Sequence, residues 1–256
     1  MRRYLVIVLM LAAACTEEDV SRLYVICGQS NAVGGASVVD LADPAMDDTY
    51  PAVQIHRYVG VASDDPFVWT ETALASLAPR GTKHGFELSL GRGLDAKYGA
   101  GRVVILQVAV SGTSISDWLT TGTVLAEQAT NLNAQLVAYV AAEESAGASR
   151  LEGVVWSQGN GDVNAQATAE AYASRLRLLG AGLRASLPGR DFRFVYDQLP
   201  DGVAGTYTST VRSQQATVSE DPGYTMIKTD SLKLRDSDHY DSLSFVELGY
   251  AFAEAL

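Results

Sequence analysis

"YVICGQSNAVGG", residues 24–35, sets an apolar run directly against a Gly-Gln-Ser-Asn turn and two further glycines. A continuous apolar run of this kind is typical of a strand that is buried on both faces of a parallel sheet. Ser30 would then stand at the carboxyl end of that strand, near the start of the next helix. A serine in such a turn either has the structural role of a turn residue or is a nucleophile positioned for attack, and the turn alone leaves both interpretations open.

Similar apolar runs recur along the chain, at residues 23–27, 103–110, 151–156 and 192–196. Between them lie two long alanine-rich segments, 124–145 and 165–187, with apolar residues at helical spacing of three and four. The alternation of strand and helix predicts a three-layer α/β/α sandwich with a central parallel sheet. Ligands of such sheets bind beyond the carboxyl ends of the strands.

Residues 40–83 depart from this alternation, because they are rich in Asp and Pro and contain one short strand candidate at 53–58. We interpret this segment as an excursion over the active face, with a plain surface loop as the alternative. No repeat or Pro/Gly/Ser linker divides the chain after residue 23. With 256 residues, 47% of them hydrophobic, the expected organisation is one domain over residues 23–256.

The charge balance argues against nucleic acid as a partner. Lys and Arg number 19 against 30 Asp and Glu, a formal net charge of -11, which repels phosphate backbones and anionic lipid headgroups. Two cysteines and three scattered histidines offer no metal-ligand spacing, so we expect neither a metal nor another cofactor. Cys27, at the end of an apolar run, is expected to be a small buried hydrophobe.

The first residues, "MRRYLVIVLMLAAAC", place two arginines before an apolar run that is too short to span a membrane. This pattern predicts an export signal at residues 1–14. "LAAAC" resembles the lipobox of bacterial lipoproteins, although Ala12 stands where that motif prefers a larger aliphatic residue. The resemblance implies a lipidated Cys15, a linker over 15–22 and a protein anchored in the cell envelope. The alternative is simple cleavage, which gives a periplasmic or secreted protein.

A serine nucleophile needs a base, and the chain has only His56, His84 and His239. His56 lies in a strand candidate and His84 precedes a helix start, so both have non-catalytic explanations. His239 follows Asp236 by three residues, a spacing that lets a carboxylate reach the imidazole Nδ1. An Asp-x-x-His in a charged loop also arises by chance, and the pairing with Ser30 gives it weight.

Four ordered segments resemble the conserved blocks of one family: "GQSN" at 28–31, "SGTSISDW" at 111–118, "GVVWSQGNGD" at 153–162 and "DSDH" at 236–239. They resemble the sialate O-acetylesterase-like carbohydrate esterases of the SGNH/GDSL hydrolase superfamily, and the resemblance spans residues 23–256. It implies the SGNH hydrolase fold, which is flavodoxin-like, an acetylated carbohydrate substrate and no cofactor.

The resemblance also implies residue roles. Ser30 would attack an acetyl ester, His239 would take its proton, and Asp236 would orient the imidazole. The oxyanion would be bound by the N–H groups of Ser30 and Gly112 and by the side-chain amide of Gln158. The residues expected to contact substrate are Gln29, Asn31, Asn160, Asp162 and Trp118, while Trp156 is expected to be buried.

Two departures from the family pattern keep other functions open. Asn160 stands where the family usually has Glu, and Ser111 replaces the first glycine of a Gly-Gly-Thr segment. An amide cannot orient a histidine as a carboxylate does, so one alternative is a glycan-binding lipoprotein without turnover. Another is a GDSL-type lipase or thioesterase with a longer acyl substrate, against which the "WSQGNGD" block argues.

Overall fold

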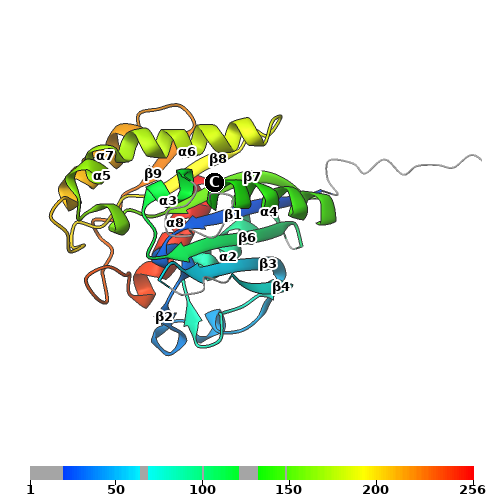
Figure 1. The fold of residues 1–256 in the computed structure, drawn as a ribbon. Helices are drawn as coiled ribbons and strands as arrows, with labels where there is room; N and C mark the ends of the chain where they lie inside the picture. Colours follow the sequence, from blue (N-terminus) through cyan, green and yellow to red (C-terminus); the bar gives the residue numbers. More distant parts are fainter. Residues whose placement is uncertain (1–19, 64–68, 100, 121–131, 148) are drawn as a thin grey trace, which may run out of the picture.

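The computed structural model describes residues 20–63, 69–99, 101–120, 132–147 and 149–256. Within these residues a seven-stranded sheet has the order β4-β3-β6-β1-β7-β8-β9 (Figure 1). Its strands are β1 (Ser21–Gly28), β3 (Tyr50–Val61), β4 (Thr70–Leu77), β6 (Val103–Ser111), β7 (Ser149–Ser157), β8 (Arg193–Asp197) and β9 (Tyr224–Ile227). A separate short ladder pairs β2 (Ala36–Ser37) with β5 (Lys83–His84).

β1 lies in the middle of the sheet, in parallel register with β6 on one side and β7 on the other. The pairs β3 with β6, β7 with β8 and β8 with β9 are also parallel, while β4 is antiparallel to β3. The predicted parallel sheet is therefore confirmed, with one antiparallel strand at its edge. Gly28, the last residue of β1, pairs with Ser157 at the end of β7, so the turn after β1 lies at the centre of the carboxyl edge.

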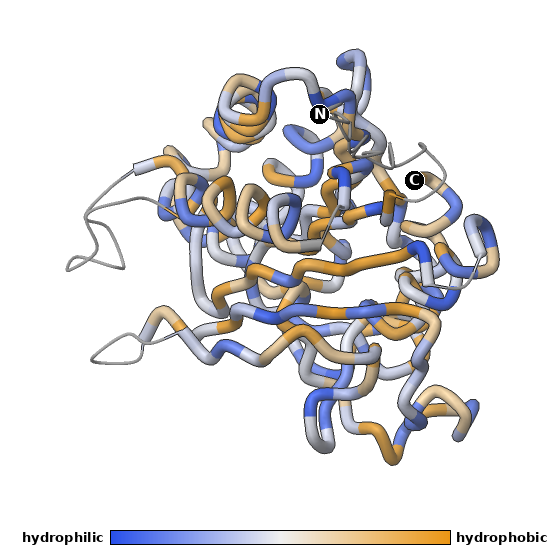
Figure 2. Tube along the Cα trace, turned by 90° about the vertical axis from the view of Figure 1, so that its right-hand side faces the viewer, coloured by the Kyte–Doolittle hydropathy of each residue, from blue (hydrophilic) through white to orange (hydrophobic). Residues whose placement is uncertain are grey.

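Helices cover both faces of the sheet, and β1 shows why its apolar run is continuous. Leu23, Val25 and Cys27 belong to one buried cluster, and Tyr24 and Ile26 belong to the cluster on the opposite face. Figure 2 shows the apolar strands in the interior of the molecule. The first face carries α3 (Ile115–Leu119), α4 (Leu132–Gly147), α5 (Gln166–Glu170), α6 (Tyr172–Ser186) and α7 (Thr208–Val218), and the second carries α2 (Glu87–Tyr98) and α8 (Ser242–Ala255). The α/β/α sandwich is confirmed.

The two predicted long helices differ in detail from the observed ones. Of the predicted helix at 124–145, the part from residue 132 belongs to α4, and residues 124–131 lie outside the described residues. The predicted helix at 165–187 is divided into α5 and α6 at Ala171. Three short 3-10 turns complete the described helices: η2 (Val38–Asp40), η3 (Pro44–Met46) and η4 (Asn160–Asp162).

The prediction of an excursion over residues 40–83 is wrong. β3 and β4 lie in this segment and extend the central sheet, with β3 paired to β6 from Val53 to Val61. The strand candidate at 53–58 is confirmed but is longer than predicted. The strand pattern of β3 is hard to recognise in the sequence because polar residues interrupt it. Arg57 is buried there and donates from Nε to Gln107 Oε1 at 3.0 Å, a partner fifty residues away.

The amino-terminal predictions lie almost entirely outside the described residues. Residues 1–19, including the predicted signal peptide and Cys15, are not described, while β1 begins at Ser21, inside the predicted linker at 15–22. Among the described residues, no helix is both long and apolar enough to cross a membrane. Cys27 is fully buried with a free thiol, as expected.

Candidate active site

The turn after β1 places Ser30 at the carboxyl edge of the sheet. Gly28 has a φ of +133°, and a Cβ atom there would lie 2.1 Å from the carbonyl oxygen of Ser157, so only glycine fits. The N–H of Gln29 donates to that same oxygen at 3.0 Å. The chain then turns into α1 (Ser30–Val33), a single helical turn. This close approach of two strand ends sets the position of Ser30.

The carbonyl groups at the end of α1 are held by side chains from distant segments. Gln107, buried on β6, donates from Nε2 to the carbonyl oxygens of Ala32 at 2.6 Å and Val33 at 3.3 Å. Arg80 donates to the carbonyl oxygen of Gly34 at 3.0 Å. Since the last carbonyls of a helix have no partners inside it, these bonds fix a turn that is too short to be stable alone.

His239 and Asp236 form the predicted pair on the loop before α8. The ring Nδ1 lies 2.9 Å and 3.0 Å from the two carboxylate oxygens of Asp236. Burial acts to raise the pKa of Asp236, but hydrogen bonds from the Asp238 N–H, the His239 ring and the His239 N–H outweigh it and lower that pKa to about 2. An ionised carboxylate at Nδ1 leaves the His239 Nε2 free to accept a proton.

Ser30 and His239 line one cavity, of about 280 Å³. The other residues that line it are Gln29, Ser111, Gly112, Asn160, Gly161 and Asp238. Within the described residues no hydrogen bond joins the Ser30 hydroxyl to the His239 ring. Hydrogen bonds of catalytic groups are often long before substrate binds, so the shared cavity is the relevant observation.

Two of the three expected oxyanion donors lie at this cavity. Within the described part of the chain, the N–H groups of Ser30 and Gly112 donate to no other protein group, which leaves both available to a bound molecule. Gly112 has a φ of +80°, a conformation that favours glycine at this turn.

The structure does not support Gln158 as the third donor. Its Nε2 has three acceptors within reach: Gln29 Oε1 at 3.0 Å, the Thr113 carbonyl oxygen at 3.1 Å and Asp162 Oδ2 at 2.7 Å. Gln158 is buried and does not line the cavity. Both amide hydrogens of Gln158 are therefore used in hydrogen bonds to buried protein groups. Asn160, two residues later, lines the cavity instead.

The two asparagines expected to contact substrate hold the His239 loop. The Nδ2 groups of Asn31 and Asn160 both donate to the carbonyl oxygen of Asp238, at 3.1 Å and 3.0 Å. Asn31 Oδ1 also accepts from the Tyr240 N–H at 3.4 Å. Asn31 does not line the cavity, so its expected substrate contact is not observed, whereas Asn160 reaches both the loop and the cavity.

Asp162 and Trp118 are not substrate contacts, because both are fully buried. Trp118 packs edge-on against Trp156, which is buried as expected, with 5.1 Å between ring centroids. Asp162 accepts hydrogen bonds from Gln158 and from the Ile115 N–H, and burial raises its pKa to about 6. The spacing of Ile115 and Trp118 by three residues is a sequence signal for one buried helix face.

Gln29 lines the cavity, but its side-chain oxygen serves the neighbouring loop. Gln29 Oε1 accepts from Gln158 Nε2 and from the Gly161 N–H at 3.1 Å. It therefore positions the segment that carries Asn160. The resemblance placed these residues in the right segment, and only the hydrogen bonds separate cavity residues from supporting ones.

The other two histidines have partners away from the cavity. His56, on β3, contacts Glu143 through Nδ1 and Glu71 through Nε2, the latter at 3.2 Å. His84 is buried and its Nε2 lies 2.7 Å from the hydroxyl of Ser242. Among the described residues, no group of three or more His, Cys, Asp or Glu side chains is arranged to hold a metal ion.

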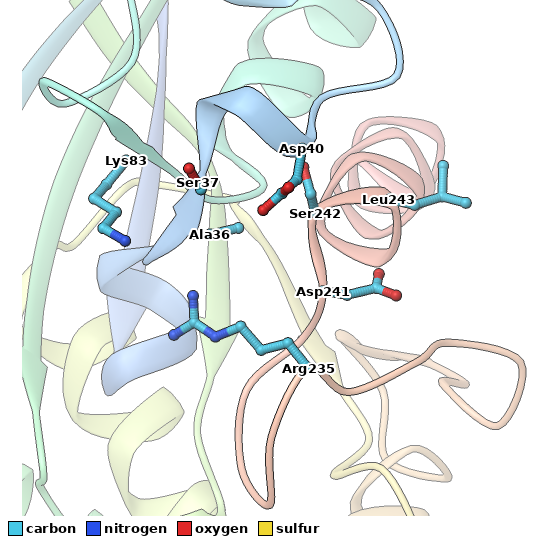
Figure 3. Close-up of a pocket in the computed structure, with 8 residues that line it drawn as sticks. All are labelled: Ala36, Ser37, Asp40, Lys83, Arg235, Asp241, Ser242 and Leu243. Carbon is cyan, nitrogen blue, oxygen red and sulfur yellow. The ribbon is translucent and has the colours of Figure 1, made fainter.

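A larger cavity, of about 420 Å³, lies next to the His239 loop (Figure 3). Arg235 lines it and also lies 3.2 Å from Asp236 Oδ2, so the guanidinium group joins the two regions. The other lining residues are Ala36, Ser37, Asp40, Lys83, Asp241, Ser242 and Leu243. This cavity also presents a serine with a histidine partner, Ser242 with His84, but His84 Nδ1 lies near the carbonyl oxygen of Gly85, not near a carboxylate.

Solved structures with the same fold include one described as a carbohydrate acetylesterase. A protein of Arabidopsis thaliana superposes with a TM-score of 0.68 at 19% identity, covering 92% of this chain and 97% of that one. A carbohydrate acetylesterase from Xanthomonas citri superposes with 0.66 at 15% identity, covering 91% and 55%. NanS superposes with 0.68 at 14% identity, covering 93% and 96%. At these identities the likeness concerns the fold alone.

Sequence comparison is more specific. No curated protein matches the chain. The model of the family described as carbohydrate esterase, sialic acid-specific acetylesterase, matches residues 20–256, which is nearly the whole chain. The chain therefore belongs to the sialic acid-specific acetylesterase family of carbohydrate esterases and is a carboxylic ester hydrolase.

Proposed function

We propose that the protein is a serine esterase that removes O-acetyl groups from carbohydrate, with Ser30 as nucleophile, His239 as base and Asp236 as orienting acid. The observation that carries this proposal is the cavity shared by Ser30 and by a histidine whose Nδ1 faces an ionised carboxylate. A serine nucleophile, a histidine base and a carboxylate that orients the histidine are the three groups of the Ser-His-Asp mechanism of ester hydrolysis.

The reaction has two halves. The Ser30 hydroxyl oxygen attacks the acetyl carbonyl carbon while His239 Nε2 takes the hydroxyl proton, and collapse of the tetrahedral intermediate returns that proton to the departing sugar oxygen. Water then gives a proton to His239, attacks the acetyl-serine, and acetate leaves as the Ser30 hydroxyl is restored. No redox partner is required.

The oxyanion of each intermediate is assigned to three donors at the cavity. Two are the N–H groups of Ser30 and Gly112. We assign the third to Asn160 Nδ2 in place of Gln158, because Asn160 lines the cavity and one of its two amide hydrogens has only a long contact, 3.4 Å, to Asp238 Oδ1. Such donors contribute most when they are fixed before the reaction begins.

The alternatives are less well supported. A glycan-binding protein without turnover was suggested by Asn160 in place of Glu, but Asp236 supplies a carboxylate to His239 in this chain. The family match to sialic acid-specific carbohydrate esterases and the "WSQGNGD" block argue against a long-chain lipase or thioesterase.

The finer substrate and the location belong to the same proposal. The family description names sialic acid, so O-acetylated sialic acid is our first candidate among acetylated sugars. We further propose export to the cell envelope, with lipidation of Cys15, from the apolar run and lipobox-like residues at 1–15. Retention of labelled palmitate by the wild type but not by Cys15→Ser would test the anchor.

The test of the activity is acetate release by the full chain from acetylated sialic acid, acetylated xylan and a simple acetate ester, with an octanoate ester for comparison. Ser30→Ala should lower the rate by about 10⁴ to 10⁶ without unfolding the protein. Ser242→Ala is the matched control, because it removes the other serine hydroxyl that contacts a histidine. Activity that survives Ser30→Ala and disappears in Ser242→Ala would move the reaction to the larger cavity.

A further inference from the structure

Asp197 is a buried carboxyl group for which the reaction described above has no use. It is the last residue of β8, is 4% exposed, and does not line the cavity with Ser30. Burying a carboxyl group is costly unless it is hydrogen-bonded, so its partners indicate what the position contributes.

Two hydroxyl groups donate to the same oxygen of Asp197. Ser157, at the end of β7, donates to Oδ2 at 3.1 Å, and Tyr240 donates to Oδ2 at 2.9 Å. The other oxygen, Oδ1, is buried without a partner among the described residues. The carboxyl group therefore joins the end of β7 to the residue that follows His239.

One of these segments carries Ser30. Ser157 pairs with Gly28 in the sheet register, and its carbonyl oxygen accepts the Gln29 N–H at 3.0 Å. The Cβ of any residue other than glycine at position 28 would overlap that carbonyl group, so the two strand ends are in direct contact. A shift of Ser157 would therefore move the turn that begins at Ser30.

The other segment carries His239. Tyr240 follows His239 directly, is fully buried, and packs edge-on against Phe245 with 5.6 Å between ring centroids. Its N–H donates to Asn31, the residue after Ser30. The Tyr240 side chain is thus the point at which the His239 loop is anchored in the core.

We propose that Asp197 is a positioning residue for ester hydrolysis, whose carboxyl group ties the strand end beside Ser30 to the loop that carries His239. The inference rests on the proposed function for its kinetic consequences. Both hydroxyl groups donate to one buried oxygen, and losing either bond would leave a polar group unsatisfied in the core, so the two bonds hold the segments in register. A misplacement of about 1 Å in reacting groups can cost about 10²-fold in rate.

The decisive variant is Tyr240→Phe, which removes one hydroxyl and keeps the ring. Tyr196→Phe is its matched control, since Tyr196 is the residue before Asp197, is fully buried, and donates to the Gln215 carbonyl oxygen at 2.6 Å. We expect both variants to lose stability, but only Tyr240→Phe to lower kcat, by about 10- to 10²-fold with little change in KM. Equal kcat values in the two variants would overturn the proposal.

Substitutions at Asp197 test the carboxyl group itself. Asp197→Asn keeps an oxygen that can accept both hydroxyl groups, whereas Asp197→Ala removes the acceptor. We expect Asp197→Asn to retain kcat within about tenfold of wild type and Asp197→Ala to lose about 10²-fold. Equal losses in the two variants, with both folded, would show that acceptance of the two hydroxyls is not what matters.

A second readout separates this inference from the proposed function. The ¹⁵N signals of the histidine rings can be followed in the full chain whether or not it releases acetate, and His56 serves as the internal reference because Glu71 and Glu143 hold it elsewhere. Tyr240→Phe should shift the His239 signals and leave those of His56 in place. A wild type without esterase activity would contradict the proposed function, and unchanged His239 signals would contradict the positioning role.

Discussion

Asn31 and Asp238 are joined directly: the Nδ2 of Asn31 donates to the carbonyl oxygen of Asp238 at 3.1 Å. Asn31 follows Ser30 and Asp238 precedes His239, so this bond ties together the backbone segments that carry the proposed nucleophile and the proposed base. The same asparagine accepts the Tyr240 N–H at 3.4 Å and is only 3% exposed. One buried amide therefore holds both sides of the His239 loop against the turn after β1.

Asn31→Ala is expected to lower kcat by about 10- to 10²-fold with KM little changed, because the two reacting groups lose a shared support. The buried Tyr240 N–H, which loses its Asn31 acceptor, should also lower the free energy of unfolding by about 1–3 kcal/mol. Steady-state kinetics and denaturant unfolding measure the two effects. Asn164→Ala, at an exposed position, is the control. A rise in KM with unchanged kcat would return Asn31 to a substrate-binding role.

Asp236→Asn is expected to lower kcat by about 10⁴, as an amide in the orienting role does in serine proteases, because it favours the wrong imidazole tautomer. The amide oxygen can still accept the N–H groups of Asp238 and His239, so the loop should keep its shape. Asp230→Asn, which alters an exposed carboxylate paired with Arg212, is the control for charge. A mild loss in Asp236→Asn would direct attention to Asn160 as the group that supports catalysis.

Replacing Asn160 by alanine should mainly lower kcat, whereas replacing Gln158 by alanine should mainly lower stability. Asn160→Ala removes a donor at the cavity and should lower kcat by about 10²- to 10³-fold. Gln158→Ala removes an amide that is hydrogen-bonded beneath the cavity, so its main effect should be on stability. Comparing kcat with the free energy of unfolding for both variants decides the assignment. A larger loss of kcat in Gln158→Ala would restore the oxyanion role that the family resemblance implies.

Stability should fall as the pH rises from about 4 to 7. Burial raises the pKa of Asp197 to about 7 and that of Asp162 to about 6, against about 3.9 for aspartate in an unfolded chain. The folded state therefore binds these protons more tightly, and the stability they contribute is complete below pH 4 and is lost as the pH rises through the folded-state values. The difference should be on the order of a few kcal/mol.

Denaturant unfolding of the wild type and Asp197→Asn between pH 4.5 and 8 measures this dependence. The variant lacks the ionisation at position 197, so its stability should change less over the range from pH 5 to 8. A wild type whose stability rises over that range, with a parallel curve for the variant, would contradict the raised pKa of Asp197.

Local patterns in the sequence were sufficient for much of the fold and for part of the site. The apolar run at 23–27 predicted a central strand because both of its faces are buried, and the turn after it placed Ser30 at the sheet edge. Asp236 and His239 were paired correctly because they are three residues apart on one loop. The length of β3 was underestimated because its buried Arg57 is hydrogen-bonded to Gln107 on another strand, which the local sequence does not show.

By itself, then, the sequence determined the alternation of strands and helices, the place of Ser30 and the Asp236–His239 pair, since each depends on neighbours within a few residues. Only the tertiary structure decided which side chains reach the cavity. It buried Trp118, bound the Gln158 amide to three acceptors and left Asn160 as a lining residue of the cavity. Those outcomes depend on hydrogen bonds between segments far apart in the chain, and no local pattern records which partner a buried amide will find.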